Sequence, residues 1–187
     1  MRIFGIDPGS TRTGYGCVET DGTRHQLVTC GAIASPAGST FPDKLHVIHA
    51  TLARLLRETS PACVVVENLF YSRNVRSALQ LGHARGVVLL AAVQAGVPIV
   101  EYTPAEIKLA VVGYGRADKT QVQQMVKLLL GLAAVPTPHD AADALAAALC
   151  HSHSGTSALA RRTTRALPRH LKNWRDYRPA TAGRQTP

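Results

Sequence analysis

The sequence predicts a layered α/β domain in which helices flank a mixed β-sheet. Two observations lead to this prediction. Three strand-like segments joined by short turns open the chain, and apolar strand-like runs then alternate with segments whose apolar residues recur at helical spacing. The first pattern is typical of antiparallel strands, and the second is typical of parallel strands connected by helices. A sheet that contains both is mixed.

The first three predicted strands form an antiparallel meander. Residues 3–7 are a short apolar run that ends in a carboxylate and meets the turn Pro8-Gly9, which is typical of a buried central strand. Residues 13–19 and 26–34 are expected to form the second and third strands. The dipeptide Asp21-Gly22 between them is a strong hairpin signal, so these two strands should pair with each other.

Helices and strands alternate through the middle of the chain. Apolar residues at helical spacing predict a helix over residues 41–58. Residues 62–67 are a second apolar run that ends in a carboxylate, and they predict a fourth strand. A long helix is expected over residues 75–95, stopped by a glycine and a proline, and a fifth strand is expected over residues 97–102.

The last part of the domain is predicted to be helical. Helices are expected over residues 104–112, 119–132 and 139–150, with Asp118 as a possible N-cap of the second. The chain of 187 residues is long enough for one domain with a real core. We assign that domain to residues 1–154.

The net charge of +9 is concentrated at the end of the chain. Residues 155–187 contain eight of the 21 Lys and Arg residues and one acid, Asp176, together with Pro, Gly, Ser and Thr. This composition predicts a basic, flexible C-terminal tail that attracts polyanions without reading their sequence. A tail that only increases solubility is the alternative.

The remaining composition argues against a membrane or secreted protein. The longest apolar run, residues 87–93, is far too short to cross a bilayer, and no signal-like apolar region opens the chain. A cytoplasmic location without a membrane role is therefore expected. The four cysteines have no metal-binding spacing, and each is expected to be a small buried hydrophobic residue: Cys17, Cys30, Cys63 and Cys150.

Four carboxylates are the candidate functional residues. Asp7 and Glu67 end two apolar strands, while Asp140 and Asp143 are three residues apart and share one face of the last helix. An acid beside a core is costly unless a cation neutralises it, and that cation could be a metal ion or a buried Arg or Lys. Asp140 could also be a first-turn acid that interacts favourably with the helix dipole.

An oxygen-only donor set favours a hard divalent cation. Mg²⁺ prefers oxygen ligands and is usually completed by substrate phosphate, and two such ions about 4 Å apart can support phosphodiester hydrolysis. No thiolate joins the set, which disfavours soft metals. His139 is a weaker candidate for metal binding or proton transfer. His151 and His153 are expected in surface or capping roles, because their spacing places them on different faces of the helix.

Five motifs match one known family in order along residues 1–153. They are GIDPGSTRTGYG at 5–16, VENLF at 66–70, ALQLGHARG at 78–86, VVGYGRADK at 111–119 and DAADAL at 140–145. With these motifs the chain resembles the RuvC family of Holliday junction resolvases, within the ribonuclease H-like superfamily. The resemblance implies a ribonuclease H-like three-layer domain with a five-stranded mixed sheet flanked by helices.

The resemblance also implies an activity and its partners. It implies a homodimeric endonuclease that binds a four-way DNA junction, makes two symmetric nicks with 5′-phosphate and 3′-hydroxyl ends, and works with a branch-migration motor complex. By motif position, the catalytic metal ligands would be Asp7, Glu67, Asp140 and Asp143, holding two Mg²⁺ ions for which Mn²⁺ could substitute. The helix over residues 75–95 is apolar on more than one face and could supply the dimer interface.

Four further residues are expected to contact DNA. Phe70 corresponds to an aromatic residue of the family that inserts among junction bases, and stacking on an unpaired base contributes about 1–3 kcal/mol in proteins that bind single strands. Lys108 and Lys119 match basic residues implicated in the activity of the family. Arg76 is included as another expected DNA contact.

Three alternatives compete with the junction-resolving nuclease. A kinase or actin-like ATPase would use residues 7–11 for phosphate, but such proteins need two lobes and about twice this length, and the Asp140 and Asp143 pair has no role in them. A non-catalytic DNA-binding protein would depend on the basic tail, yet four converging acids repel DNA unless metal offsets them. The third alternative is another ribonuclease H-like nuclease.

Overall fold

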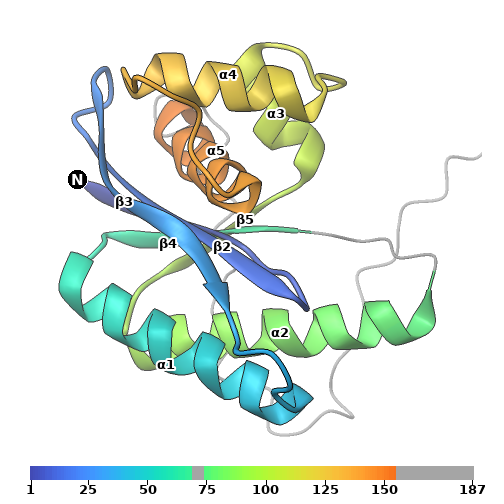
Figure 1. The fold of residues 1–187 in the computed structure, drawn as a ribbon. Coiled ribbons are helices and arrows are strands. Elements are labelled where there is room, and N and C mark those ends of the chain that lie inside the picture. Colours follow the sequence, from blue (N-terminus) through green and yellow to red (C-terminus); the bar gives the residue numbers. More distant parts are fainter. Residues whose placement is uncertain (69–73, 155–187) are drawn as a thin grey trace, which may run out of the picture.

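The structure of the protein is a computed structural model that describes residues 1–68 and 74–154. The described residues form a three-layer α/β domain around a five-stranded sheet with the order β3-β2-β1-β4-β5 (Figure 1). The strands are β1 (Arg2–Asp7), β2 (Arg12–Thr20), β3 (His25–Ala34), β4 (Cys63–Glu67) and β5 (Ile99–Tyr102). The helices are α1 (Phe41–Thr59), α2 (Val75–Gln94), α3 (Pro104–Val112), α4 (Lys119–Leu129) and α5 (His139–Ser154).

The sheet is mixed, as the sequence predicted. β1, β2 and β3 pair antiparallel, whereas β4 and β5 join β1 as parallel strands. The predicted hairpin turn connects β2 to β3: Gly22 has a φ of 103°, and the Asp21 carboxylate accepts hydrogen bonds from the backbone N–H groups of Thr23 and Arg24. The ribonuclease H-like arrangement that the resemblance implied is confirmed.

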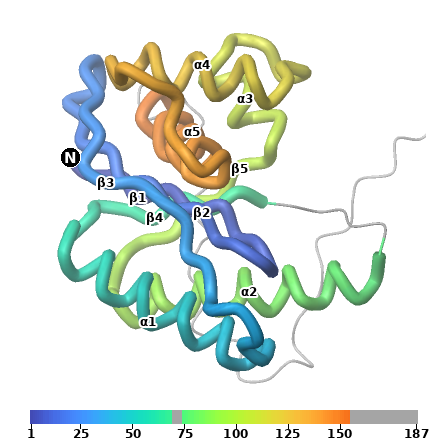
Figure 2. The backbone as a smooth tube through the Cα atoms, viewed as in Figure 1, coloured from blue at the N-terminus to red at the C-terminus, as the bar shows by residue number. Residues whose placement is uncertain are grey.

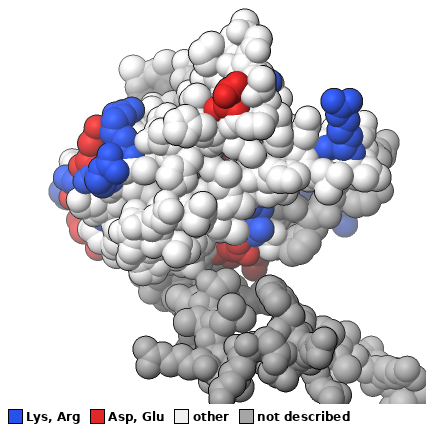
Figure 3. All heavy atoms as spheres, turned by 90° about the horizontal axis from the view of Figure 1, so that it is seen from below, with Lys and Arg blue, Asp and Glu red and all other residues white. Residues whose placement is uncertain are grey.

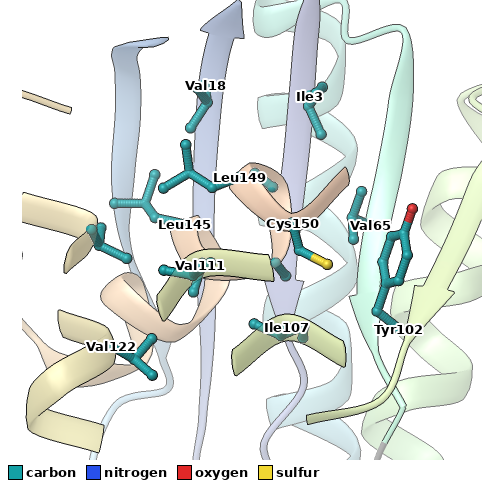
Figure 4. Packing of buried hydrophobic residues seen from close by; sticks show 14 of the residues in the cluster. Ile3, Val18, Val65, Tyr102, Ile107, Val111, Val122, Leu145, Leu149 and Cys150 are labelled. Carbon is teal, nitrogen blue, oxygen red and sulfur yellow. The ribbon is translucent and has the colours of Figure 1, made fainter. Parts of the chain in front are cut away.

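The helices cover the two faces of the sheet unequally. α1 and α2 lie on one face, while α5 packs on the other face with α3 and α4 against its outer side (Figures 1 and 2). Successive side chains of a strand point to opposite faces, so the core divides in two. Ile3, Val18 and Val65 pack with Leu145, Leu149 and Cys150 of α5 (Figure 4), whereas Phe4, Cys17 and Val64 pack with α1 and α2.

Glycines let α5 lie unusually close to the sheet. A Cβ atom on Gly5 would stand 1.9 Å from the backbone oxygen of Ala144, and one on Gly14 would stand 2.0 Å from the backbone oxygen of Asp140. On Gly16 it would stand 2.6 Å from the side chain of Leu145. No real side chain tolerates such distances, so these three positions fix how near the helix approaches β1 and β2.

Most element boundaries agree with the sequence prediction to within a few residues. The capping box between Asp118 and Gln121 confirms the expected N-cap of α4. The helix ends at Leu129 rather than at residue 132, because the chain turns through Gly131 with a φ of 61°. α5 continues to Ser154 rather than ending at Cys150, because its last turn is buried against the rest of the domain.

The cysteine and membrane expectations can be compared with the described residues. Cys17, Cys63 and Cys150 are buried and Cys30 is half-buried, and all four are free thiols. Within residues 1–68 and 74–154, no helix is both long enough and apolar enough to span a membrane. The predicted basic tail, residues 155–187, lies outside the described residues.

Candidate active site

The strand ends bring Asp7 and Glu67 to the same face of the sheet. Ile3 and Gly5 of β1 face α5, so Asp7, two residues further along, faces α5 as well. Cys63 and Val65 place Glu67 of β4 on the same face by the same alternation. β1 and β4 are parallel with Ile6 opposite Val66, so the next residue of each strand, Asp7 and Glu67, ends beside the other.

α5 brings the second pair of acids to this strand edge. Asp7 lies opposite Gly14 in the β1–β2 register, and the absence of a side chain at Gly14 lets the backbone of Asp140 approach β2. Asp140 and Asp143 are both half-buried, although their neighbours Ala141, Ala142 and Ala144 are fully buried. The charges of both Asp140 and Asp143 act on Asp7 at the end of β1, and that of Asp143 also acts on Glu67 at the end of β4.

Most of the predicted site residues line one cavity. It has a volume of about 430 Å³, and its polar lining consists of Asp7, Glu67, Asp143, Lys108 and Lys119. The first turn of α4 supplies Lys119 and the middle of α3 supplies Lys108. Asp140 lines a neighbouring cavity of about 380 Å³ instead, together with the loop of residues 9–12 and Ser77 of α2.

The acids of this cavity repel one another. Burial and then the nearby charges of Glu67 and Asp143 raise the pKa of Asp7 from 3.8 to about 8, and Asp140 contributes in the same direction. Burial and Asp143 also raise the pKa of Glu67, while a hydrogen bond with Asp7 acts in the opposite direction. Asp7 therefore tends to keep its proton and to donate it to Glu67. The region holds more negative charge than its own cations balance.

Lys119 partly compensates this negative charge. Its Nζ lies 3.1 Å from Oδ2 of Asp143, and the ammonium group lowers the pKa of Asp7 and of Glu67. The side chain of Lys119 is 76% exposed whereas that of Asp143 is only 16% exposed. An exposed ammonium of this kind can leave its carboxylate partner at little cost.

The donor set suits Mg²⁺ chemically. All four acids offer oxygen ligands, and the raised pKa of Asp7 shows that a cation would be stabilised beside it. Among the described residues, no three or more His, Cys, Asp or Glu residues form a group that could hold a metal ion by themselves. Mg²⁺ is usually bound through one or two carboxylates and completes its shell with water and substrate phosphate.

The other predicted site residues have different positions. Arg76 is exposed in the first turn of α2, where its backbone N–H donates to the side chain of Asn74. Phe70 lies outside the described residues. His139 is exposed at the first residue of α5, next to Asp140.

His151 and His153 lie in the last turn of α5, and His153 has a capping role, because it bonds a carbonyl of the last turn of α3. Both rings are half-buried inside the last turn of α5. Nδ1 of His151 hydrogen-bonds the hydroxyl of Tyr102 (2.9 Å), and Nδ1 of His153 hydrogen-bonds the backbone oxygen of Ala110 (3.0 Å). The helix was predicted to end at Cys150, and its continuation to Ser154 carries both rings partly into the domain.

Several residues shape the site without taking part in its chemistry, and the sequence did not predict them. Pro104, Ile107, Val122 and Ala146 form the apolar part of the cavity lining. Gly14 decides where Asp140 lies, and the pair Gly14 and Gly16 within a strand was a readable signal of close backbone approach.

Comparison with known proteins decides the family. The family model described as crossover junction endodeoxyribonuclease RuvC matches residues 3–151, which is most of the chain. The chain belongs to the RuvC family. It is 50% identical over 155 residues to RuvC of Alkaliphilus oremlandii, covering 83% of this chain and 94% of that protein. RuvC of Trichlorobacter lovleyi is 48% identical over 179 residues, covering 96% of this chain and all of that protein.

A solved structure of the RuvC family has the same fold. RuvC of Thermus thermophilus in complex with Holliday junction substrate matches with a TM-score of 0.81 and 36% sequence identity, covering 85% of this chain and 97% of that chain. A separate structure of the same RuvC matches with a TM-score of 0.77. The described residues therefore have the fold of that RuvC.

Proposed function

We propose that this protein is an endonuclease that resolves Holliday junctions by hydrolysing phosphodiester bonds at the cavity of Asp7, Glu67 and Asp143. Membership of the RuvC family supports the activity, and the similar RuvC that was solved with a Holliday junction supports the substrate. The observation that carries the proposal for the site is the convergence of acids from β1, β4 and α5, with two lysines in the same cavity.

Divalent metal is the cofactor that this site requires. We assign Asp7, Glu67, Asp140 and Asp143 as the residues that hold two Mg²⁺ ions, with Mn²⁺ as a substitute. Bound metal would activate the attacking water and stabilise the leaving oxygen of the scissile phosphate. Metal binding also needs the carboxylates to be ionised, so it competes with the proton that Asp7 holds.

Two lysines add positive charge to the site. Lys108 and Lys119 line the same cavity as the acids, so a DNA strand that enters the cavity would meet them. We propose that Lys119 exchanges Asp143 for a phosphate oxygen when DNA binds. In the free protein the ammonium group of Lys119 offsets the charge of the acids. In the DNA complex the same group would bind a phosphate oxygen of the scissile strand.

Arg76 and Phe70 are proposed to act further along the DNA. The first turn of α2 borders the cavity that contains Asp140, so Arg76 lies where a strand leaving the site would pass. For Phe70, the proposal of stacking on junction bases is based on its position in the family motif alone.

A second copy of the chain would provide the second nick. A four-way junction has two equivalent strands to cut, so a two-fold dimer places one site on each of them. The face of α1 and α2 supports this arrangement, because Figure 3 shows a broad area there without charged side chains. Exposed apolar side chains lie along α2: Val75, Leu79, Leu90 and Val93. We propose that α2 forms the dimer interface and that the dimer acts with a branch-migration motor complex.

Cleavage assays test the proposed reaction. A synthetic four-way junction, a linear duplex of the same sequence and an RNA–DNA hybrid are incubated with the protein, with and without Mg²⁺ or Mn²⁺. We expect paired nicks in the junction only, and only with metal. Asp7→Asn should abolish cleavage but leave junction binding intact, because the carboxylate charge needed for metal is lost.

Asp21→Asn is the matched control for that assay. Asp21 is an exposed acid in the β2–β3 turn, a position that asparagine also suits, so this variant should cleave like the wild type. Cleavage of the hybrid in preference to the junction would instead indicate another ribonuclease H-like nuclease. Undiminished cleavage by Asp7→Asn would refute the assignment of the metal site.

Sedimentation velocity tests the dimer. Leu90 is 50% exposed on α2 and lines an apolar hollow with Leu45 of α1 and Leu79, so Leu90→Arg should convert dimer into monomer. Leu128→Arg is the control, because Leu128 is 69% exposed on α4, a helix on the other side of the sheet. Equal sedimentation of the two variants as dimers would rule out α2 as the interface.

A further inference from the structure

A pair of histidines lies at the end of α5 that is remote from the acids. His153 is in the last turn of α5 and His25 is the first residue of β3. Their Nε2 atoms are 3.3 Å apart, and both rings are half-buried. The chain runs through 13 residues of α5 from Asp140 to His153, which corresponds to about 20 Å along a helix. The histidine pair is therefore separate from the candidate active site.

The geometry of the pair matches two ligands of one tetrahedral metal ion. Two nitrogens that are each about 2.0–2.1 Å from a zinc ion lie about 3.3–3.4 Å from each other. Rings whose lone pairs converge on that ion have centres about 5.2 Å apart, whereas rings pointing straight at each other across the same nitrogen distance have centres about 5.6 Å apart. The ring centres of His25 and His153 are 5.2 Å apart.

The other nitrogen of each ring already has the type of partner that metal-binding histidines have. Nδ1 of His153 donates to the backbone oxygen of Ala110 (3.0 Å), which leaves its Nε2 as the basic nitrogen of the neutral ring. Nδ1 of His25 hydrogen-bonds Oγ1 of Thr20 (2.9 Å). Metal-ligating histidines commonly make such a bond through their second nitrogen, which fixes the tautomer and the orientation of the ring.

The hydroxyl of Thr20 permits both Nε2 atoms to be unprotonated together. A hydroxyl has one donor and two acceptor sites. Oγ1 of Thr20 accepts from the backbone N–H of Gly22 (2.9 Å), it can accept from Nδ1 of His25, and it then donates to Oγ of Ser152 (3.1 Å). In the alternative tautomer of His25 one Nε2 donates a hydrogen bond to the other, whereas in this arrangement both lone pairs face the same point, where a metal cation can bind.

The electrostatic surroundings favour a cation over two charged imidazoles. Burial and the neighbouring His153 lower the pKa of His25, so the neutral ring predominates near pH 7, while the nearby Asp21 carboxylate acts in the opposite direction. Neutral imidazole is the form that binds metal. The negative charge of Asp21 stabilises a cation held by His25.

We propose that His25 and His153 form a second metal site, which binds a divalent transition-metal ion of the zinc class through two imidazole nitrogens. Water completes the coordination shell, since the described residues offer no group of three protein ligands. Imidazole selects Zn²⁺, Ni²⁺, Co²⁺ or Cu²⁺ over Mg²⁺, so this site and the carboxylate cavity differ in metal preference. A bound ion would join the β2–β3 hairpin to α5 and, through Ala110, to α3.

Metal titration of the full-length protein tests this site. The protein is stripped with chelator and titrated with Zn²⁺ in excess Mg²⁺, so that Mg²⁺ competes for the carboxylates. We expect the wild type to bind one Zn²⁺ more than His25→Gln or His153→Gln. Changes in the second shell alone cost about 10- to 100-fold in metal affinity, so the loss of a ligand should weaken Zn²⁺ binding at least about tenfold.

His46→Gln provides the matched control. His46 is an exposed histidine of α1, so this variant should bind Zn²⁺ like the wild type. Zn²⁺ should raise the melting temperature of the wild type and of His46→Gln, but not that of the two ligand variants. Junction cleavage in Mg²⁺ shows that each variant is folded, because His25 and His153 lie outside the catalytic cavity.

Cobalt supplies a readout that needs no variant. Co²⁺ bound at a tetrahedral site gives intense visible absorption bands, which Zn²⁺ should abolish by displacement. Weak octahedral bands only, or equal Zn²⁺ binding by the wild type and His25→Gln, would overturn the proposal. Both outcomes are independent of DNA cleavage.

Discussion

α5 carries titratable side chains at both of its ends, acids near its N-terminus and histidines near its C-terminus. At the first end, the negative charges of Asp143 and Asp140 help burial and Glu67 to raise the pKa of Asp7 to about 8. At the second end, His151 and His153 have hydrogen-bond partners, Tyr102 and Ala110. One end of the helix therefore carries acids that repel one another, while at the other end the Nδ1 atoms of the histidines are hydrogen-bonded.

The comparison explains why only one end is suited to catalysis. Acids whose negative charge is not balanced by nearby cations are stabilised when a cation binds. An enzyme can use this stabilisation to hold metal and substrate phosphate. The hydrogen bonds already formed by the Nδ1 atoms of His151 and His153 contribute instead to the stability of the fold. Variants at either end should separate the two roles.

The largest effect is expected from Gly14→Ala at the acid end. The new Cβ would stand 2.0 Å from the backbone oxygen of Asp140, so α5 or β2 must move. We expect a loss of about 3 kcal/mol or more in the free energy of unfolding, and a large loss of junction cleavage in the protein that remains folded. Urea denaturation and a cleavage assay measure the two effects.

Gly115→Ala is the control for this variant. A Cβ on Gly115 meets only the backbone oxygen of Ala105 at 3.5 Å, which is ordinary van der Waals contact. This variant should keep its stability to within about 0.5–1 kcal/mol and should cleave the junction. If Gly14→Ala behaved in the same way, the close approach of α5 would have no functional consequence.

A smaller effect, of opposite sign, is expected from Asp7→Asn in metal-free protein. The pKa of Asp7 is raised from 3.8 to about 8 in the folded state, so the folded protein binds the proton more tightly than the unfolded chain. The stabilisation by this proton is complete below pH 4 and is lost as the pH rises toward 8. Asparagine carries no charge, so at pH 8 the variant should be more stable than the wild type by about 1–3 kcal/mol.

Thermal melting across this pH range with chelator, and then with Mg²⁺, measures the effect. Mg²⁺ should raise the melting temperature of the wild type at pH 8 but not that of Asp7→Asn, because only the ionised carboxylate gains from metal. A wild-type protein whose metal-free stability stayed flat or rose between pH 4 and 8 would contradict the repulsion described for this cavity.

The smallest effect is expected at the histidine end. Oγ1 of Thr20 bonds His25, Gly22 and Ser152, and Thr20→Val removes these partners while it keeps the volume. We expect a loss of about 1–2 kcal/mol in the free energy of unfolding, with junction cleavage unchanged well below the melting temperature. Thr51→Val on α1 is a matched substitution away from both ends, and a comparable loss there would remove the special role of Thr20.

The sequence by itself determined the strands and helices of the domain and which carboxylates are candidate metal ligands. Alternating and helical apolar patterns gave all five strands and all five helices of the described residues, and strand-ending carboxylates gave Asp7 and Glu67. These predictions succeed because local periodicity reflects which face of an element is buried. The spacing of Asp140 and Asp143 on one face of an apolar helix added the second pair, and in the structure the charges of both act on Asp7.

Only the tertiary structure decided how α5 lies on the sheet and what its ends contact. Three contacts bring together residues that are far apart in the chain. They are the close approach of Gly14 to the backbone of Asp140, the ion pair of Lys119 with Asp143, and the contact of His25 with His153. No local pattern encodes such distances. They follow from the packing of whole elements against one another, and for that reason the sequence did not predict the last turn of α5 or its contacts.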